Sequence, residues 1–199
     1  DFKRHAIQNC LYGVDIDLGA VEIAKLRLWL SLIVDEEDIK QIKPLPNLDY
    51  KIVQGNSLSS VEQNLFNQPL FAKLEELKSP FFNETNASKK QEYKKQIDEL
   101  ILQITNNNQN FDFKIYFSEI FHDHGAGGFD VVIANPPYNA KLTDSEKKLY
   151  KTKYESVRTG RQDTAAIFVE VAKMIGNSKM ELSYILPYRL FSRKRNHGQ

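Results

Sequence analysis

The chain has 199 residues, a net charge of +1 at pH 7, 41% hydrophobic residues and 27% charged residues. This composition is ordinary for a soluble globular protein with a substantial core. The small net charge excludes binding to nucleic acid by bulk electrostatics alone, although it is compatible with a local basic patch. The single cysteine, Cys10, excludes an internal disulfide framework, and we therefore expect a cytoplasmic protein. No segment approaches the ~20 apolar residues that span a bilayer, so we expect no membrane contact.

The first predicted strand lies in the stretch NCLYGVDID and is expected to be buried and to end at Asp15. Asp17 is placed to cap a helix over residues 18–34. The second half of this helix is apolar nearly all round, so we expect it to be covered on more than one side. A second short strand follows within residues 50–56 and has a polar exit at Asn56.

Residues 58–128 interrupt this alternation and predict a pair of helices. Apolar residues recur in this segment at helical spacing, with lysines and acids between them. They are Leu70, Phe71, Leu74 and Leu77 in the first half, and Tyr93, Ile97, Leu100, Ile101 and Ile104 in the second. We therefore predict a helical hairpin that is inserted into the rest of the fold.

A third strand is predicted over residues 129–135 and a fourth over residues 181–187, with a helix over residues 164–175 between them. One face of this helix is predicted to carry Ala165, Phe168, Val169, Ala172 and Ile175. Short apolar strands that alternate with helices are typical of a parallel sheet. The sequence thus predicts the α/β class, with a doubly wound, mainly parallel sheet.

Three parts follow from this organisation: a first part of the core over residues 1–57, the helical insertion over residues 58–128, and a second part of the core over residues 129–199. Both ends of the sequence are abrupt, because it opens just before a strand and stops without a closing element. We expect the chain to be a piece of a longer protein.

The third strand ends in Asn135-Pro136-Pro137-Tyr138. Prolines lack an N–H donor and have a fixed φ, so they cannot continue a strand, and each pushes the residue before it into an extended conformation. The chain is therefore expected to leave the sheet rigidly, with an amide and an aromatic ring at the carboxyl end of the strand. In open α/β sheets this edge is where ligands bind.

Polar side chains end three of the predicted strands, at Asp15, Asn56 and Asn135. Adjacent strand ends of a doubly wound sheet line one crevice, so these groups are expected to converge. An acid after the second strand of such a fold typically accepts hydrogen bonds from a ribose diol, and the amide of Asn56 can read an adenine edge with its donor and its acceptor. The alternative for Asp15 is a helix cap, but Asp17 is the better cap and leaves Asp15 for a ligand.

Taken together, the stretches GVDID, QGNSL and NPPY resemble the S-adenosylmethionine-dependent adenine-N6 DNA methyltransferases. The methylase domains of type I and type IIG restriction–modification enzymes are the most similar. Like this chain, they have a long helical insertion before the strand that ends in the NPPY motif, which here is the stretch FDVVIANPPY. The resemblance covers about residues 11–191. It implies an incomplete S-adenosylmethionine-dependent methyltransferase fold, S-adenosylmethionine as the cofactor, and double-stranded DNA with a flipped adenine as the partner. Target-recognition regions, and a nuclease region in some of these enzymes, would belong to the same longer protein.

The resemblance also implies catalytic roles for residues 135–138. An adenine amino group is a poor nucleophile, because its lone pair is delocalised into the ring. The side-chain oxygen of Asn135 and the backbone oxygen of Pro136 would hold the two amino protons and direct the lone pair towards the methyl group, while Pro137 helps to keep the acceptors rigid. Tyr138 would stack on the base after it is flipped out of the duplex.

Cofactor-binding roles are implied for Asp15 with its neighbour Ile16, and for Asn56 with its neighbour Ser57. Asp15 matches the family's ribose-binding acid, and Asn56 matches a position that contacts the cofactor adenine. The family's glycine-rich loop for the methionine part of the cofactor is absent, since Gly13 is the earliest glycine. Asp163 falls at a position that lines the pocket in this family, but a helix N-cap is the favoured interpretation.

Two other functions are compatible with the sequence. A protein glutamine or RNA methyltransferase also uses an Asn-Pro-Pro-Tyr exit, but the long insertion argues against the compact glutamine enzymes. A degenerate methyltransferase fold that only binds DNA or scaffolds a partner is disfavoured by the intact motif. For His122-Asp123-His124 a surface loop is favoured over a metal site, so no metal is predicted. Arg189 and the basic residues 193–195 form a basic tail, for which phosphate contact and an ordinary solvated surface are equally compatible with the sequence.

Overall fold

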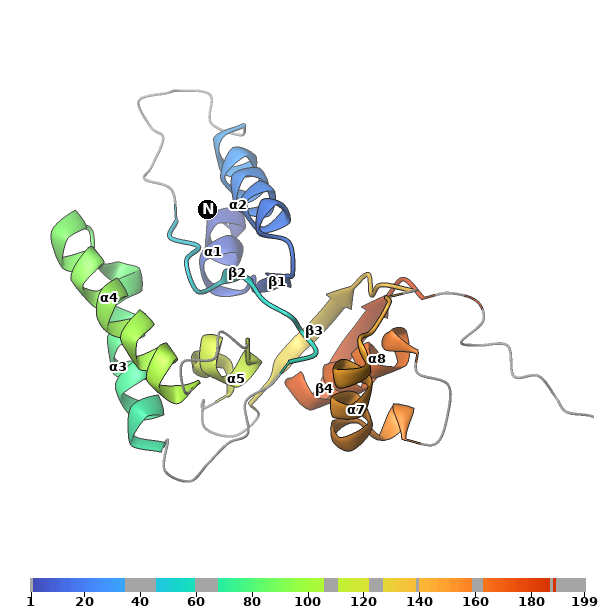
Figure 1. Cartoon of the computed structure of the whole chain (residues 1–199). Coiled ribbons are helices and arrows are strands. Elements are labelled where there is room, and N and C mark those ends of the chain that lie inside the picture. Colours follow the sequence, from blue (N-terminus) through green and yellow to red (C-terminus); the bar gives the residue numbers. More distant parts are fainter. Residues whose placement is uncertain are drawn as a thin grey trace, which may run out of the picture. The chain divides into compact units, whose positions relative to one another are not determined.

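The computed structural model of the chain describes residues 2–34, 46–59, 68–105, 111–121, 127–138, 140–158, 163–186 and Tyr188. It divides into two compact units, Asp1–His122 and Asp123–Gln199. Each unit contains helices and a parallel sheet of two strands (Figure 1). The structure is thus mixed α/β with small parallel sheets, which is compatible with a methyltransferase fold. A single doubly wound sheet stays a prediction, as do the boundaries at residues 57 and 128.

The first unit begins with a helix and a parallel strand pair. Its elements in this part are α1 (Phe2–Asn9), β1 (Gly13–Asp15), α2 (Leu18–Ile33) and β2 (Ile52–Gln54). Gly13 lies opposite Ile52 and Asp15 lies opposite Gln54, so both strands end at the same edge. Parallel strands need a crossover connection, and α2 lies within the connection between β1 and β2.

One face of α2 packs in a small core with α1 and the strand region. The buried members of this core are Ile7, Val21, Leu32, Leu48 and Ile52. On α2 itself, Ile23, Leu26 and Leu30 are each about half exposed. The expectation that this helix is covered on more than one side is therefore wrong for the residues described. The predicted first strand is also shorter than expected and only partly buried, because the chain before it forms α1 and a turn at Cys10.

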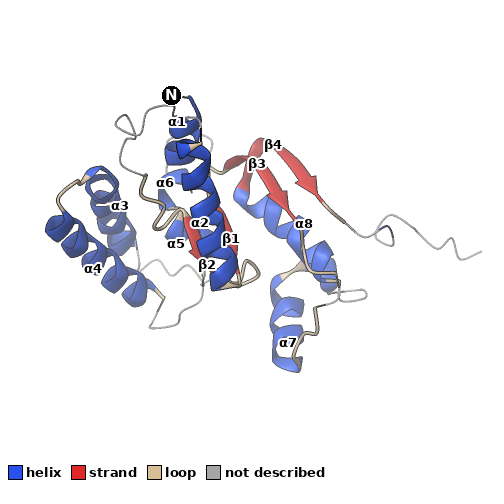
Figure 2. Cartoon of the chain, turned by 90° about the horizontal axis from the view of Figure 1, so that it is seen from above, coloured by secondary structure: helices blue, strands red, loops and turns tan. Residues whose placement is uncertain are grey.

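Two long helices form the second part of this unit: α3 (Gln68–Asn83) and α4 (Ala87–Ile104). They lie side by side (Figures 1 and 2) and share a core with Tyr50 and α5 (Phe113–Tyr116). The buried residues of this core are Tyr50, Leu74, Phe81, Ile97, Leu100, Ile101, Ile104 and Ile115. Both helices are thus present at the predicted positions, whereas their origin as an insertion stays a prediction.

A buried lysine fixes α3 to the short helices α5 and α6 (Ser118–Phe121). The Nζ of Lys78 donates hydrogen bonds to the carbonyl oxygens of Ile115 and Tyr116, and it forms an ion pair of 3.0 Å with Glu119. Burial lowers the pKa of the Lys78 ammonium, an effect that Glu119 partly offsets. These bonds hold the segment that carries Tyr116 against α3.

The ring of Phe111 occupies the space beside Gly55, just after β2. Phe111 is buried and contacts the rings of Phe113, Tyr116 and Phe117. A Cβ atom at position 55 would lie 2.4 Å from this ring. Only glycine therefore allows the strand exit and Phe111 to approach each other this closely.

The second unit contains β3 (Phe129–Ala134), α7 (Asp144–Lys153), the 3₁₀-helix η3 (Glu155–Val157), α8 (Thr164–Ile175) and β4 (Gly176–Tyr184). Strand β4 begins earlier than predicted. Phe129 lies opposite Gly176 while Val131 lies opposite Glu181, so extra residues of β4 form an irregularity. The first of these residues, Asn177, Ser178 and Lys179, are polar, so the hydrophobic pattern did not indicate the first half of the strand.

Helix α8 has the predicted bounds but a different buried face. Ala165, Ala172 and Ile175 are buried as expected. Ile167 and Val171 are buried in place of Phe168 and Val169, which are only partly buried. None of the described helices is both long and apolar enough to cross a membrane.

Candidate functional site

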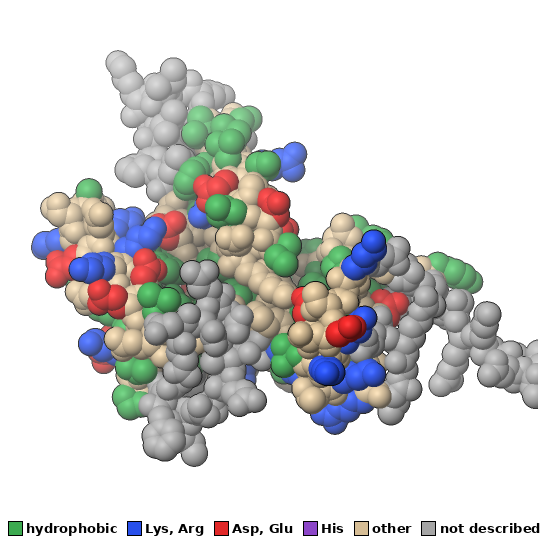
Figure 3. Space-filling view, in the orientation of Figure 1, with side chains coloured by type: hydrophobic (Ala, Val, Ile, Leu, Met, Phe, Trp, Pro, Cys, Tyr) green, Lys and Arg blue, Asp and Glu red, His purple; other side chains and the backbone are tan. Residues whose placement is uncertain are grey.

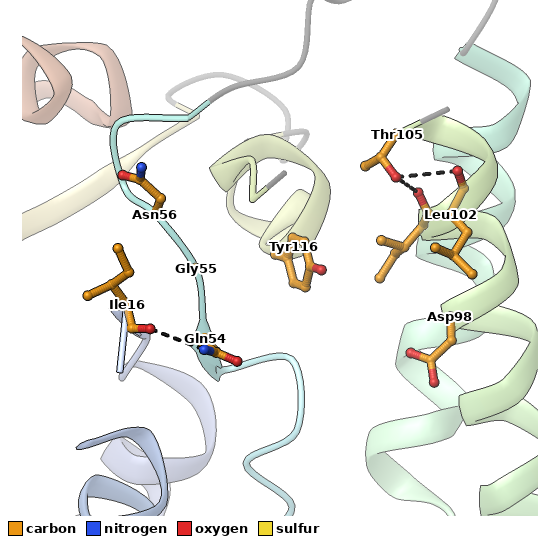
Figure 4. Close-up of a pocket in the computed structure, with 9 residues that line it drawn as sticks. Ile16, Gln54, Gly55, Asn56, Asp98, Leu102, Thr105 and Tyr116 are labelled. Atoms are coloured by element: carbon orange, nitrogen blue, oxygen red, sulfur yellow. Dashed lines mark hydrogen bonds between the residues drawn. The ribbon is translucent and has the colours of Figure 1, made fainter. Parts of the chain in front are cut away.

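The ends of β1 and β2 are joined by hydrogen bonds at the edge where the candidate cofactor residues lie. The carbonyl oxygen of Asp15 accepts from the N–H of Gly55 at 2.8 Å. The side chain of Gln54 donates to the carbonyl oxygen of Ile16 at 3.1 Å (Figure 4). Residues 15–16 and 54–56 therefore form one continuous edge.

Asp15 and Asp17 have different structural roles at this edge. Asp17 caps α2 by accepting from the N–H of Ala20 at 2.9 Å, which confirms the predicted cap. The exposed carboxylate of Asp15 accepts from the N–H of Asp17 at 2.8 Å. A carboxylate has about four acceptor positions, so this single bond at Oδ1 leaves the group able to accept from a ligand hydroxyl.

The exit of β2 is held by side chains that bond to the nearby backbone. The Oδ1 of Asn56 accepts from the N–H of Leu58 at 3.0 Å. The hydroxyl of Ser59 lies 2.7 Å from the carbonyl oxygen of Asn56 and 2.8 Å from that of Phe111. Asn56 and Ser57 are both partly exposed, so their side chains remain accessible from this edge.

A cavity of about 490 Å³ lies between this edge and the helices of the same unit (Figure 4). Its lining comes from the strand exits (Ile16, Gln54, Gly55 and Asn56), from α4 and its C-cap residue (Asp98, Ile101, Leu102 and Thr105), and from Tyr116 of α5. This volume is within the usual range for small-molecule sites, and the lining combines apolar side chains with several polar groups. Two of the four predicted cofactor residues, Ile16 and Asn56, thus line one cavity.

Asp98 interacts with two phenol groups near this cavity. Its Oδ1 accepts a hydrogen bond from the hydroxyl of Tyr50. Burial, followed by this bond, raises the pKa of Tyr50, while burial and the charge of Asp98 raise the pKa of Tyr116. Both phenols therefore stay neutral at physiological pH.

The exit of β3 is built differently, around Asn135-Pro136-Pro137-Tyr138. Pro136 is buried, Asn135 and Pro137 are exposed, and Tyr138 is partly buried. The Tyr138 hydroxyl lies 2.9 Å from the carbonyl oxygen of Ile185 and 3.2 Å from Oδ1 of Asn135. The exit is thus tied to the residue that follows β4, and it presents the amide of Asn135 at the surface.

Thr164 is a further residue of this exit that the sequence did not indicate. Its hydroxyl donates to the carbonyl oxygen of Pro137 at 2.6 Å, and its side chain is buried. Thr164 is the first residue of α8, where Asp163 caps the helix by accepting from the N–H of Ala165 at 3.1 Å. The interpretation of Asp163 as an N-cap is confirmed.

The predicted convergence of Asp15 and Asn56 with Asn135 stays a prediction, because the groups belong to different compact units. The first unit brings Asp15, Ile16 and Asn56 to one strand edge. Residues 122–124, Arg189 and residues 193–195 lie outside the described residues.

Comparison with known families identifies the chain. Residues 9–198 match the model of a family described as "Eco57I restriction-modification methylase". The chain belongs to this family. The resemblance to the methylases of restriction–modification enzymes is therefore confirmed.

Two curated relatives of this methylase chain support the assignment. One, from Methanocaldococcus jannaschii, is named "Putative type II restriction enzyme and methyltransferase" and is 28% identical over 278 residues, covering 93% of this chain and 22% of the relative. The other is a type II restriction enzyme and methyltransferase of Escherichia coli, 28% identical over 197 residues, covering 95% of this chain and 15% of the relative. The chain spans about a fifth or less of each relative's length. No solved structure matches it.

Proposed function

We propose that this chain methylates the N6 atom of adenine in double-stranded DNA, as part of a restriction–modification enzyme that uses S-adenosylmethionine. The observation that carries this proposal is the exit of β3, where Asn135 is exposed on a loop that two prolines and Thr164 keep in place. Membership of a restriction–modification methylase family supports DNA as the substrate.

Asn135 and Pro136 are proposed to hold the amino group of the target base. The Asn135 side-chain oxygen and the Pro136 carbonyl oxygen each accept one amino proton, which favours a tetrahedral nitrogen with its lone pair directed outwards. Fixed acceptors stabilise this geometry without reorganisation during the reaction. The ring of Tyr138 stacks on the flipped base, while its hydroxyl is bonded to the carbonyl oxygen of Ile185.

The adenosine part of the cofactor is proposed to be held by Asp15, Ile16, Asn56 and Ser57. When bound, S-adenosylmethionine supplies the electrophilic methyl group. The cavity beside Ile16 and Asn56 has room for a nucleoside. Asp15 has acceptor capacity for the ribose hydroxyls, and the Asn56 amide presents a donor for the base.

Helix α7 offers a surface for the DNA backbone. It follows the catalytic exit in the chain and carries Lys147, Lys148, Lys151 and Lys153 in its last two turns. Figure 3 shows basic side chains gathered over α7. Lysines in such an arrangement contact phosphates without reading sequence.

Methyl transfer by the complete protein tests this function. Duplex DNA, RNA and a glutamine-containing peptide are each incubated with S-adenosylmethionine labelled in the methyl group, and the modified nucleoside is identified by mass spectrometry. The expected product is N6-methyladenine in DNA. Label in RNA or in the peptide, with none in DNA, would replace this proposal with the alternative substrates.

A further inference from the structure

The cavity of the first unit has two walls with different origins. One wall is the strand edge with Ile16 and Asn56, where cofactor contacts are expected. The other wall consists of Asp98 and Leu102 on α4 and of Tyr116 on α5. Figure 4 shows Ile16 and Asn56 on one side and Asp98 and Leu102 on the other, with the ring of Tyr116 between them.

Asp98 is fixed to the strand region by a contact distant in sequence. The hydroxyl of Tyr50, just before β2, donates to its Oδ1. The ring of Tyr50 is buried and makes an edge contact with Phe81, with ring centroids 5.3 Å apart. Lys94, one turn before Asp98, also contacts Asp49 at 3.3 Å. The carboxylate is therefore held at the cavity before any ligand binds, and this lowers the entropic cost of binding.

The chemistry of the described lining selects one class of ligand. It contains a carboxylate at Asp98 and no lysine or arginine, so a phosphate group is disfavoured. A carboxylate only accepts hydrogen bonds when ionised. The ligand must therefore offer N–H or O–H groups, together with an apolar surface for Ile16 and Leu102. A neutral nucleoside satisfies both requirements.

We infer that the helices α4 and α5 form a wall of the cofactor site, and that Asp98 accepts hydrogen bonds from the adenosine part of S-adenosylmethionine. This inference rests on the proposed cofactor. It gives the long helical segment a direct part in binding, and it adds a second carboxylate to the one at Asp15.

The test is calorimetry on the complete protein with S-adenosylhomocysteine and with adenosine. Asp98→Asn removes the charge but keeps an oxygen that can accept from Tyr50. Its affinity for both ligands is expected to fall roughly tenfold or more, because a hydrogen bond to a charged acceptor is lost. Glu99→Gln, at an exposed neighbour on α4, is the matched control and is expected to bind both ligands as the parent does.

A second variant separates binding from structural support. Tyr50→Phe removes the hydroxyl that fixes Asp98 but keeps the buried ring, and it is expected to lower the melting temperature with less than about a threefold change in affinity. Asp98→Asn is expected to melt as the parent does. Three outcomes would overturn the inference. Asp98→Asn could bind both ligands as the parent does, it could fail to fold, or both variants could lose affinity and stability in parallel.

The inference and the proposed function fail separately. Binding that depends on Asp98, without methylation of DNA, would support the inference and refute the function. If the enzyme methylates DNA adenine but its affinity for adenosine ligands does not change in Asp98→Asn, the function would be supported and the inference refuted. A parent protein that binds neither ligand would overturn the inference.

Discussion

The exits of the two parallel strand pairs achieve their fixed conformations by opposite means. In the first unit, Asp15 and Asn56 accept hydrogen bonds from backbone N–H groups two residues ahead. In the second unit, prolines supply no such donors, and hydroxyl groups donate to carbonyl oxygens instead, from Thr164 to Pro137 and from Tyr138 to Ile185.

This difference separates two kinds of functional residue. Asp15 and Asn56 would combine a ligand role with a local structural role. Asn135 contributes less to the local structure, because the two prolines and the hydroxyl groups of Thr164 and Tyr138 fix its loop. Removing the side chain of Asp15 or Asn56 should therefore change stability and binding together, whereas removing that of Asn135 should affect catalysis with little change in stability.

The largest expected effect is at Asn135. In Asn135→Ala, kcat should fall by about 10²–10³-fold, because one acceptor that acts most strongly in the transition state is removed. The affinity for S-adenosylhomocysteine and the melting temperature should stay near those of the parent. Single-turnover methyl transfer and calorimetry measure the two quantities. A loss of affinity equal to the loss of rate would remove the distinction between the two exits.

Asp15 gives the corresponding result for the first unit. Asp15→Asn keeps an acceptor for the N–H of Asp17, so the protein should stay folded. Affinity for S-adenosylhomocysteine should fall by about 10- to 100-fold, as expected when charge-assisted hydrogen bonds of about 1.5–3 kcal/mol are lost. Asp15→Ala should lose the same affinity and also melt earlier. Equal melting temperatures for the two variants would show that the bond to Asp17 contributes little to stability.

Tyr138 separates the role of its ring from that of its hydroxyl. Tyr138→Ala should weaken binding of the flipped base by about 1–3 kcal/mol, the range measured for base stacking on single-stranded sites. Tyr138→Phe keeps the ring and should lose only about threefold in kcat, from the missing hydrogen bond to Ile185. Fluorescence of 2-aminopurine at the target position reports base flipping. Normal flipping and methylation by Tyr138→Ala would exclude a stacking role.

Thr164 should act on turnover through the Asn135 loop. Thr164→Val removes the hydroxyl that donates to Pro137, and a lost hydrogen bond of about 1 kcal/mol corresponds to roughly fivefold in kcat. The KM for S-adenosylmethionine should stay unchanged, and Thr164→Ser should restore the rate. Thr152→Val, which removes a hydroxyl bonded to Leu149 on α7, is the control. An equal loss in both variants would assign Thr164 a role in general stability.

An effect of similar size is expected on DNA binding. The double variant Lys148→Ala/Lys151→Ala on α7 should weaken binding about fivefold and reduce the slope of log affinity against log salt by about two. Lys89→Ala/Lys95→Ala on α4 of the first unit should leave both quantities unchanged. Fluorescence anisotropy over a range of salt concentrations measures them. Equal effects of the two pairs would mean that the DNA contact is not confined to the second unit.

Features with local causes were predictable from the sequence. Helices α2 and α8 were placed correctly because Asp17 and Asp163 are typical caps followed by apolar residues at helical spacing. Helix α1 was missed because only one of its residues, Ile7, is buried. The start of β4 was missed because it is polar.

The candidate site was predictable in the same local sense. The strand exits at Asp15, Asn56 and Asn135 were visible because each follows an apolar run. Thr164 and Asp98 were not, because their partners lie 27 and 48 residues away. Contacts of this kind depend on packing between elements, about which the pattern within a single element contains no information.

The close approach of Gly55 to Phe111 couples two positions that are far apart in the chain. Any larger residue at position 55 overlaps the ring, so such a change is tolerated only after Phe111 has become smaller. A smaller residue at position 111 would in turn leave a void among the surrounding aromatic rings. The order of substitution is therefore constrained, and the two positions are expected to vary as a pair during the divergence of the family. Relatives that keep both Gly55 and Phe111 would then keep the shape of the strand exit beside the cavity, even where the residues that bind the ligand differ.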